Sequence, residues 1–158
     1  MPTRDRDRTQ VRRKPERGAY DLDTVAAIFD EAILCHVGVV RDGAPVVIPM
    51  IHARVGNRLY LHASPAAGLA RDARQGPEVC VTASLVDGIV LARCGRSHSL
   101  NYRSAVVFGT AERVVDDAEK RAALDAFVEH MTPGRGPELR PTTDQEVREV
   151  EVLSLIHI

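Results

Sequence analysis

The chain has 158 residues, of which 44% are hydrophobic and 27% charged, and its formal net charge is −1. That length fits one domain with one core, and that composition is typical of a globular protein and unlike a disordered one. No apolar run approaches the roughly 20 residues of a membrane helix, the polar N-terminus lacks a signal-peptide core, and three cysteines without close pairing argue against a disulfide framework, so we expect a cytoplasmic location.

Residues 1–18 predict a basic, disordered arm, and residues 19–158 predict a single domain. Residues 1–17 hold seven basic and three acidic side chains, so this segment carries +4 and the remainder −5. Such an arm could contact nucleic acid, or a phosphate on this chain or on a second subunit. Because Asp5 and Asp7 interrupt the basic run and aromatic residues are missing from it, we expect no nucleic-acid partner.

The first half of the domain predicts one helix and then a three-stranded antiparallel meander. Asp21 or Asp23 can cap a helix whose apolar residues recur at three- and four-residue steps. Two turn pairs typical of tight hairpins, Asp42-Gly43 and Gly56-Asn57, follow. The apolar helix positions are Val25, Ile28, Phe29, Ala32 and Ile33, and the strands are expected at residues 36–40, 45–55 and 58–63.

A strand that runs directly into a helix predicts a phosphate site. Ser64-Pro65 reads as an N-cap with proline at the first helical position. The helix would turn Leu69 and Ala73 inward and stop at Gly76-Pro77. Its first turn would offer unpaired N–H groups and a positive dipole end to a phosphate.

The second half predicts more antiparallel strands and two helices. Asp87-Gly88 is expected to be a hairpin turn, and Thr143 with Glu146 has capping-box spacing. We therefore predict a mainly β protein with helices (α+β), a six-stranded antiparallel split β-barrel of Greek-key type. The strands are expected at residues 79–85, 89–92, 103–115 and 149–155, and a helix from Asp116-Asp117 would place Leu124, Phe127, Val128 and Met131 on one face.

Five short motifs accompany these elements. They are Arg12-Arg13 with Arg17-Gly18 and Tyr20, Cys35-His36-Val37-Gly38, Asp42-Gly43 with Pro45 through Pro49, Leu59-Tyr60-Leu61-His62, and Asn101-Tyr102-Arg103-Ser104 through Gly109. In order and spacing they resemble the pyridoxamine 5′-phosphate oxidase-like flavoproteins over nearly the whole chain. The most similar branch is the flavin-nucleotide-binding group related to nitroimidazole-resistance reductases.

The resemblance implies a split-barrel homodimer that binds FMN in clefts at the subunit interface. A flavin phosphate needs several hydrogen-bond donors, and its ring system needs a flat, mainly apolar wall. The cofactor-binding positions that the resemblance implies are Val47, Ile48, Pro49 and Met50 along the isoalloxazine ring, His62 and Ser64 at the phosphate, and Arg103 and Ser104 as polar contacts.

The chain departs from the family pattern at Ala67-Gly68, where members often have Ser-Arg. A direct phosphate-binding pair is therefore missing, which leaves weakened or absent FMN binding open. Arg71, one helical turn later, is the expected substitute, with Arg12 or Arg13 of the arm as the alternative. Arginine suits phosphate because its guanidinium group is planar and stays charged.

The last six residues indicate that the reading frame is interrupted at its C-terminal end. Residues 153–158 match the translation of a transposon end used in DNA library preparation. Related proteins extend further, so we expect the natural gene to continue, with a natural final strand as the alternative. A genomic stop codon directly after Ile158 would rule out this expectation.

Three further residues allow a functional and a structural interpretation. Cys94 and His98 lack a second close ligand pair, so a metal site is not expected. His62 could hold the phosphate or be a hydrogen-bonded structural histidine, and His98 could line a substrate cleft or be merely exposed. No side chain can be assigned as an acid or base.

The leading functional expectation is an FMN-dependent oxidoreductase. It would pass reducing equivalents from a nicotinamide donor to a small organic acceptor, with the flavin performing the redox step. The alternatives are a non-catalytic flavin-binding or flavin-sensing protein, or a related barrel that uses haem or deazaflavin. Oxidation of pyridoxamine phosphate itself is disfavoured, because the resemblance favours the shorter flavin-binding branch.

Overall fold

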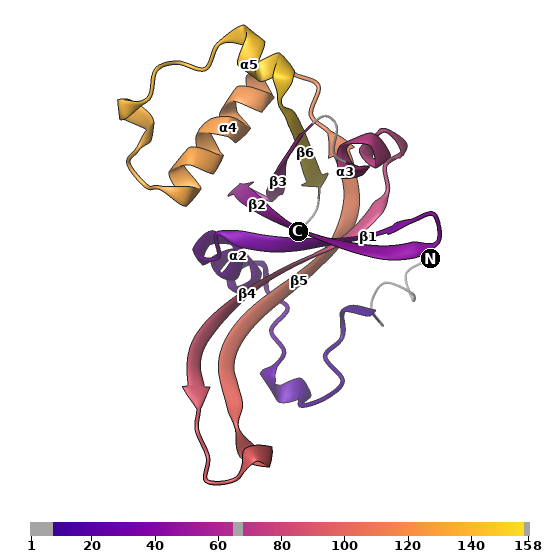
Figure 1. Cartoon of the computed structure of the whole chain (residues 1–158), viewed down its shortest axis with the longest axis vertical. Helices are drawn as coiled ribbons and strands as arrows, with labels where there is room; N and C mark the ends of the chain where they lie inside the picture. The colour runs from indigo at the N-terminus through magenta and orange to yellow at the C-terminus, as the bar shows by residue number, and fades with distance from the viewer. Residues whose placement is uncertain (1–7, 65–67, 157–158) are drawn as a thin grey trace.

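Six antiparallel strands close into a ring, and the helices lie in its connections (Figure 1). The computed structural model describes residues 8–64 and 68–156. The strands are β1 (Leu34–Arg41), β2 (Ala44–Val55), β3 (Arg58–Ala63), β4 (Glu78–Val90), β5 (Ser99–Arg113) and β6 (Glu151–Ile156). The α-helices are α2 (Leu22–Glu31), α3 (Gly68–Asp72), α4 (Asp117–Met131) and α5 (Asp144–Glu149), and 3-10 turns lie at Pro15–Arg17, Ala73–Gln75, Gly95–Ser97 and Gly136–Glu138.

The order of strands around the ring is that of a Greek key. The ring reads β1-β2-β3-β6-β5-β4, so β4 returns to pair with β1 while β6 closes the ring between β3 and β5. Three hairpin-connected strands with the fourth beside the first define this motif. The predicted six-stranded antiparallel barrel of the α+β class is confirmed.

The core fills the ring because alternate residues of each strand point inward. On β1 the inward residues are Cys35, Val37 and Val39, all buried. Phe29 of α2 is fully buried against this cluster. A second apolar cluster lies between the sheet and α4, and it contains Ala53, Tyr60, Val114, Ala123, Phe127 and Val152.

Local capping signals in the sequence match the observed helix ends. The Asp21 carboxylate accepts a hydrogen bond from the Thr24 amide at 2.8 Å, which starts α2. Gly76 adopts the left-handed conformation, φ 58°, where the segment after α3 stops. The apolar face predicted for α2 extends too far, however. The helix ends at Glu31, and Ile33 is exposed.

The predicted hairpin turn at Asp87-Gly88 is wrong. β4 continues to Val90 and pairs with β5, which begins at Ser99 rather than Arg103. The register shifts between Val86 and Gly88, so Asp87 is the extra residue of a bulge. Gly88 is not among the glycines with positive φ, which a tight two-residue hairpin would require. The result is a long β4–β5 hairpin that extends away from the barrel (Figure 1).

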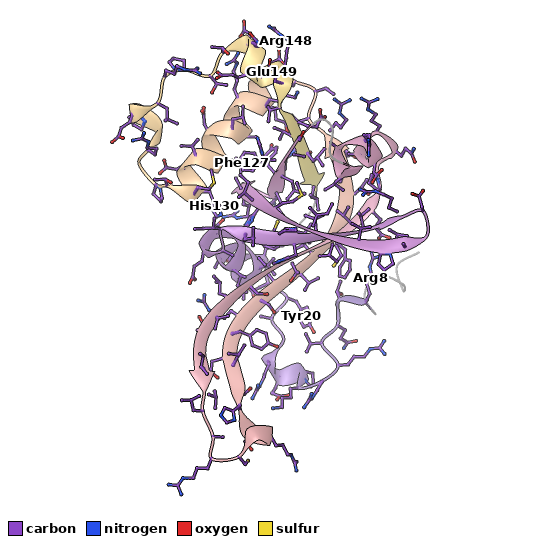
Figure 2. All side chains as sticks on the ribbon, in the orientation of Figure 1. Arg8, Tyr20, Phe127, His130, Arg148 and Glu149 are labelled. Carbon is purple, nitrogen blue, oxygen red and sulfur yellow. The ribbon has the colours of Figure 1, made fainter. Side chains whose placement is uncertain are left out.

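Residues 8–18 of the basic segment contact the barrel. Arg8, labelled in Figure 2, forms an ion pair with Glu78 at 2.5 Å. Its guanidinium group lies 4.5 Å from the centre of the Phe108 ring. The Val11 amide donates to the Tyr20 hydroxyl at 2.8 Å. Residues 1–7 lie outside the described part of the chain. Among the described helices, none is long and apolar enough to cross a membrane.

Candidate functional site

The barrel has one stretch where neighbouring strands separate. Residues 44–51 of β2 pair with β1, but β2 pairs with β3 only over its last four residues, 52–55. Beyond this point, His62 and Ala63 of β3 pair only with β6 among the described strands. Over residues 47–50, the side of β2 that faces away from β1 therefore pairs with no other described strand, and we call this stretch the β2 edge.

The β2 edge combines an apolar surface with free backbone groups. Val47 is 65% exposed and Pro49 is exposed, so both side chains point out of the barrel. Ile48 is partly buried and Met50 is buried, so these two point inward. A flat ring could lie on the outer face of this strand and accept or donate hydrogen bonds at its edge.

His62 and Ser64 lie where β3 leaves the sheet. The His62 ring packs edge-on against Phe127 of α4, with ring centroids 5.8 Å apart. Phe127 is labelled in Figure 2. Partial burial lowers the pKa of His62, because the charged imidazolium loses hydration. His62 is consequently neutral at pH 7. Ser64 is exposed directly after the strand, and the predicted helix start at residues 65–67 lies outside the described residues.

A hollow of about 1080 Å³ opens beside His62. Its walls come from α4, from residues 136–142 and from the strand ends next to α4. Most of its lining is apolar, while Arg140 and Glu146 supply charge. The lining residues central to the argument are Ile51, His62, Leu124, Phe127, Met131 and Leu139.

Arg41 makes a contact with α3 that sequence reasoning missed. It is the last residue of β1, and its guanidinium group lies over Gly68 at the start of α3. Its Nε donates to Oδ2 of Asp72 at 2.9 Å. Arg71, the substitute expected from the sequence, is exposed on α3. The sequence offered no signal for Arg41, because 27 positions separate it from Gly68.

Arg103 and Ser104 lie in a different hollow, of about 870 Å³, together with Arg13 of the basic segment. No described residue lines both hollows. The Arg103 guanidinium donates to Glu31 at 2.7 and 2.9 Å and to Asp87 at 2.8 Å. These hydrogen bonds lower the pKa of both carboxyl groups. Within one chain, therefore, Arg103 and Ser104 do not share a hollow with His62.

The cysteines and His98 show local contacts. Cys94 Sγ lies 3.1 Å from the Ser97 hydroxyl, and His98 Nδ1 lies 3.2 Å from the Cys94 carbonyl oxygen. The Ser97 hydrogen bond lowers the pKa of the exposed Cys94. Burial raises the pKa of Cys35 to about 12, so this thiol stays protonated.

The chain is similar to several known proteins. A family profile described as pyridoxamine 5′-phosphate oxidase matches residues 21–156. The solved flavocytochrome Anf3 of Azotobacter vinelandii is 38% identical, with a TM-score of 0.85, over 96% of this chain and 70% of that chain. An FAD- and haem-binding protein of Mycobacterium smegmatis is 35% identical, with a TM-score of 0.81, over 89% of this chain and 68% of that chain.

A third structure shares the same fold. A candidate 5-nitroimidazole antibiotic resistance protein of Bacteroides thetaiotaomicron is 31% identical, with a TM-score of 0.74, over 88% of this chain and 81% of that chain. A search of curated proteins found no match.

Proposed function

The chain belongs to the pyridoxamine 5′-phosphate oxidase family, and from this premise we propose that it is an FMN-dependent oxidoreductase. In this proposal the protein takes reducing equivalents from a nicotinamide donor and delivers them to a small organic acceptor. A bound flavin supplies the redox chemistry, and the protein supplies binding, orientation and exclusion of water.

The observation that carries this proposal is the unpaired β2 edge beside the end of β3. Buried or ligand-facing backbone groups need partners, and the ring nitrogens and carbonyls of a flavin can provide them. Val47 and Pro49 offer the outward apolar surface on which a flat tricyclic ring would stack.

In this proposal His62 and Ser64 hold the other end of the cofactor. Both lie beyond the last β2–β3 pair, on the side toward which the strands separate. The Ser64 hydroxyl can donate to a phosphate oxygen, and neutral His62 can donate from one ring nitrogen without adding charge. Both residues would bind the phosphate and thereby orient the cofactor.

We also propose that a second copy of the chain completes the site. Arg103 and Ser104 lie in a separate hollow from His62 within one chain. Apolar side chains are exposed along the β4–β5 hairpin, and such surface supports association with another protein. A homodimer would let these residues approach the β2 edge of the partner.

A visible spectrum of the purified chain tests the proposed activity. After incubation with FMN and gel filtration, we expect retained flavin absorption bands that bleach when NADH or NADPH is added without oxygen. Recovery of the bands when a small nitroaromatic acceptor is added would demonstrate turnover. Retained bands that neither nicotinamide bleaches would favour the non-catalytic flavin-binding protein, and absence of flavin retention would contradict both.

A haem protein is the second candidate, and His62 is the observation that favours it. Neutral histidine is a common iron ligand, and His62 opens into a large, mainly apolar hollow. Two of the similar structures are described as a flavocytochrome and as an FAD- and haem-binding protein. A Soret band after haem addition, lost in His62→Ala, would support this candidate.

A further inference from the structure

The hollow beside Arg103, of about 870 Å³, lies between two segments that are far apart in the sequence. Residues of the basic segment between positions 11 and 19 form one part of its lining, and residues 99–105 of β5 form another. Figure 1 shows the basic segment, in indigo, next to the β4–β5 hairpin. Residues between positions 24 and 28 of α2 complete this side of the hollow.

The basic segment is held in place at both ends. The Val11 amide donates to the Tyr20 hydroxyl at 2.8 Å, which closes a loop between these two residues. Inside the loop, the Arg17 amide donates to the Lys14 carbonyl oxygen at 3.0 Å. Before the loop, Arg8 is anchored by its ion pair with the first residue of β4. The cations of this loop therefore have a defined position at the hollow.

Three cations of this loop have no partner among the described residues. Arg13, Lys14 and Arg17 line the hollow, and no described carboxylate or carbonyl group accepts from their side chains. The fourth cation of the lining, Arg103, is already engaged by two carboxylates, and one of these, Asp87, is the acidic residue of the lining. The hollow is therefore electropositive, and bringing three like charges together costs free energy unless an anion binds between them.

The rest of the lining suits an aromatic group. The Tyr102 ring is 63% exposed, and Leu100 is exposed as well. Exposed tyrosine rings stack on nucleobases, and the amide of Asn101 can donate and accept hydrogen bonds. A volume of about 870 Å³ is far more than a phosphate ion or a small carboxylic acid fills, and it suits a larger organic ligand. The hollow therefore fits a nucleotide, which combines a base with phosphate groups.

We propose that this hollow binds the adenosine end of the nicotinamide donor and that the chain therefore prefers NADPH to NADH. NADPH differs from NADH by one phosphate monoester on the adenosine ribose, which carries a charge of about −1.5 to −2 near pH 7. In this proposal Arg13, Lys14 and Arg17 compensate that charge, and Tyr102 stacks on the adenine ring. The inference rests on the proposed function, because it specifies the electron donor of the same reaction.

The proposed dimer connects this hollow with the flavin. Arg103 and Ser104 line the hollow, and in the proposed dimer they approach the β2 edge of the partner, on which the flavin ring would lie. A donor held by its adenosine end would extend its nicotinamide ring toward that edge. The nicotinamide then gives up a hydride to the flavin, a proton follows from water, and the donor leaves as NADP⁺.

Two adenosine phosphates test the inference without turnover. The compound 2′,5′-ADP carries the phosphate that is particular to NADPH, and 5′-AMP lacks it. Isothermal titration calorimetry of each with the full chain, incubated with FMN, gives the ratio of their dissociation constants. We expect 2′,5′-ADP to bind about 10-fold tighter or more, because charge-assisted hydrogen bonds to phosphate are strong. In Arg13→Gln/Arg17→Gln this ratio should fall to about 2-fold or less.

The matched control removes the same charge from elsewhere on the surface. Arg74 and Arg148 are exposed, line neither of the two hollows and have no partner in the described part of the chain. Arg74→Gln/Arg148→Gln should keep the wild-type ratio, and thermal unfolding should show that both double variants are as stable as the wild type. An equal fall of the ratio in both would mean that overall charge attracts the nucleotide, and would overturn the assignment to this hollow.

Tyr102 separates recognition of the base from recognition of the phosphate. Tyr102→Leu should weaken binding of both nucleotides about 10-fold, because stacking on the base is lost, and should leave their ratio unchanged. Tyr102→Phe keeps the ring and should bind both nucleotides as the wild type does. Unchanged binding in Tyr102→Leu would contradict the stacking contact.

The outcomes distinguish a failure of this inference from a failure of the proposed function. If 2′,5′-ADP and 5′-AMP bind the wild type equally, the inference fails, whatever the flavin does. If 2′,5′-ADP is preferred but neither nicotinamide bleaches bound FMN, the proposed activity fails while the hollow still binds the phosphate. If Arg13→Gln/Arg17→Gln loses a preference for FMN over riboflavin and keeps the preference for 2′,5′-ADP, these cations bind the flavin phosphate, and the assignment to the donor is overturned.

Discussion

At the scale of single residues, two histidines cap the C-terminal end of α2 by hydrogen bonds to its carbonyl groups. His52 Nε2 lies 2.8 Å from the Phe29 carbonyl oxygen, and His130 Nε2 lies 2.9 Å from the Ala32 carbonyl oxygen (Figure 2 labels His130). Each imidazole therefore donates to a carbonyl that the helix leaves unpaired. The two rings are 4.9 Å apart, so they would repel each other if both were charged.

Burial lowers the pKa of His52, and the neighbouring His130 lowers it further, while Asp30 and the Phe29 carbonyl act in the opposite direction. The folded state thus binds a proton at His52 less readily than the unfolded state, whose histidine pKa is about 6.5. Stability is then lost as the pH falls through that value. We expect the free energy of unfolding to drop by up to about 1.4 kcal/mol from about pH 7.5 to 5.5.

Urea unfolding of the wild type and His52→Asn at several pH values measures this effect. The variant should be less stable at every pH, because Phe29 loses its partner. Its dependence on pH should nevertheless be weaker, with a remainder from His62, whose pKa is also lowered. An unchanged pH dependence in His52→Asn would contradict the assignment.

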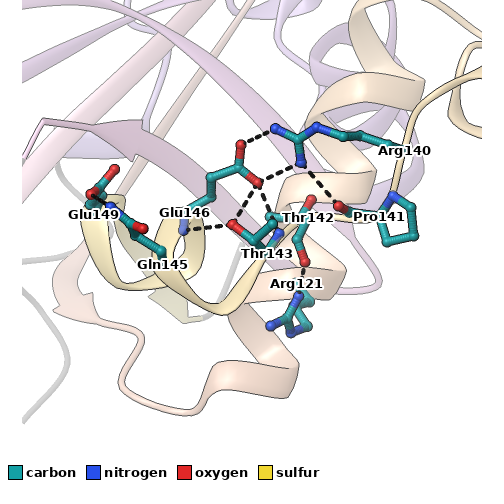
Figure 3. A network of polar contacts seen from close by, with 8 residues as sticks. All are labelled: Arg121, Arg140, Pro141, Thr142, Thr143, Gln145, Glu146 and Glu149. Atoms are coloured by element: carbon teal, nitrogen blue, oxygen red, sulfur yellow. Dashed lines mark hydrogen bonds and ion pairs between the residues drawn. The ribbon is translucent and has the colours of Figure 1, made fainter.

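At the scale of elements, α5 is organised by a capping box that the sequence predicted. The Thr143 hydroxyl accepts from the Glu146 amide at 3.3 Å, and the Glu146 carboxylate accepts from the Thr143 amide at 2.8 Å (Figure 3). The Arg140 guanidinium group donates hydrogen bonds to both oxygens of the same carboxylate. Together these contacts lower the pKa of Glu146 to about 2, with Arg140 as the largest cause.

Thr143→Ala should destabilise the protein by about 1 kcal/mol, because the first turn of α5 loses its side-chain cap. The measurement is the midpoint of urea unfolding at unchanged m-value. Thr142→Ala is the control. Its backbone carbonyl, which accepts from Arg121, stays in place (Figure 3). Equal destabilisation by both substitutions would argue against the capping contribution.

At the scale of the whole molecule, the long β4–β5 hairpin is the feature that favours association with a second subunit. It extends away from the barrel (Figure 1) and carries exposed apolar side chains on both strands. Ile89 and Leu91 are 72% and 79% exposed. The other exposed apolar residues of this region are Val86, Val90, Leu100, Tyr102 and Val106.

Leu91→Asp and Ile89→Asp should shift the proposed dimer toward monomer, because a charge at an apolar interface loses hydration without gaining a partner. Light scattering after size exclusion, over a range of concentrations, measures the mass. Val115→Asp is the control, since Val115 is 82% exposed but lies between β5 and α4. A wild-type chain that stays monomeric at all concentrations would contradict the proposed dimer.

Much of the fold could be predicted because its signals are local. The Asp21 cap, the Gly76 helix end and the Thr143 capping box each depend on residues within a few positions. The hairpins at Asp42-Gly43 and Gly56-Asn57 likewise follow from turn chemistry. The Asp87-Gly88 pair is typical of a tight turn in sequence, but in the structure it forms a bulge. The chain continues through it because β4 pairs with β5 on both sides of Asp87.

For the candidate site, too, some residues could be predicted from the sequence and others could not. The resemblance of short motifs led to the β2 edge, His62 and Ser64, and the comparisons confirm the family. Whether these residues, Arg103 and Ser104 bind the cofactor stays a prediction. The contacts of Arg41 with Gly68 and Asp72 could not be found from the sequence, because nothing near position 41 indicates them.

The sequence by itself determined most of the strands, the turns at Asp42-Gly43 and Gly56-Asn57 and the helix caps, because periodicity and capping act within a few residues of chain. The resemblance of its short motifs indicated the family. Only the tertiary structure decided where β2 leaves β3, that Arg41 pairs with Asp72, and that Arg103 is engaged by Glu31 and Asp87. These facts depend on long-range strand pairing and on the space around each side chain. Neither of these can be predicted from residues that are close together in the sequence.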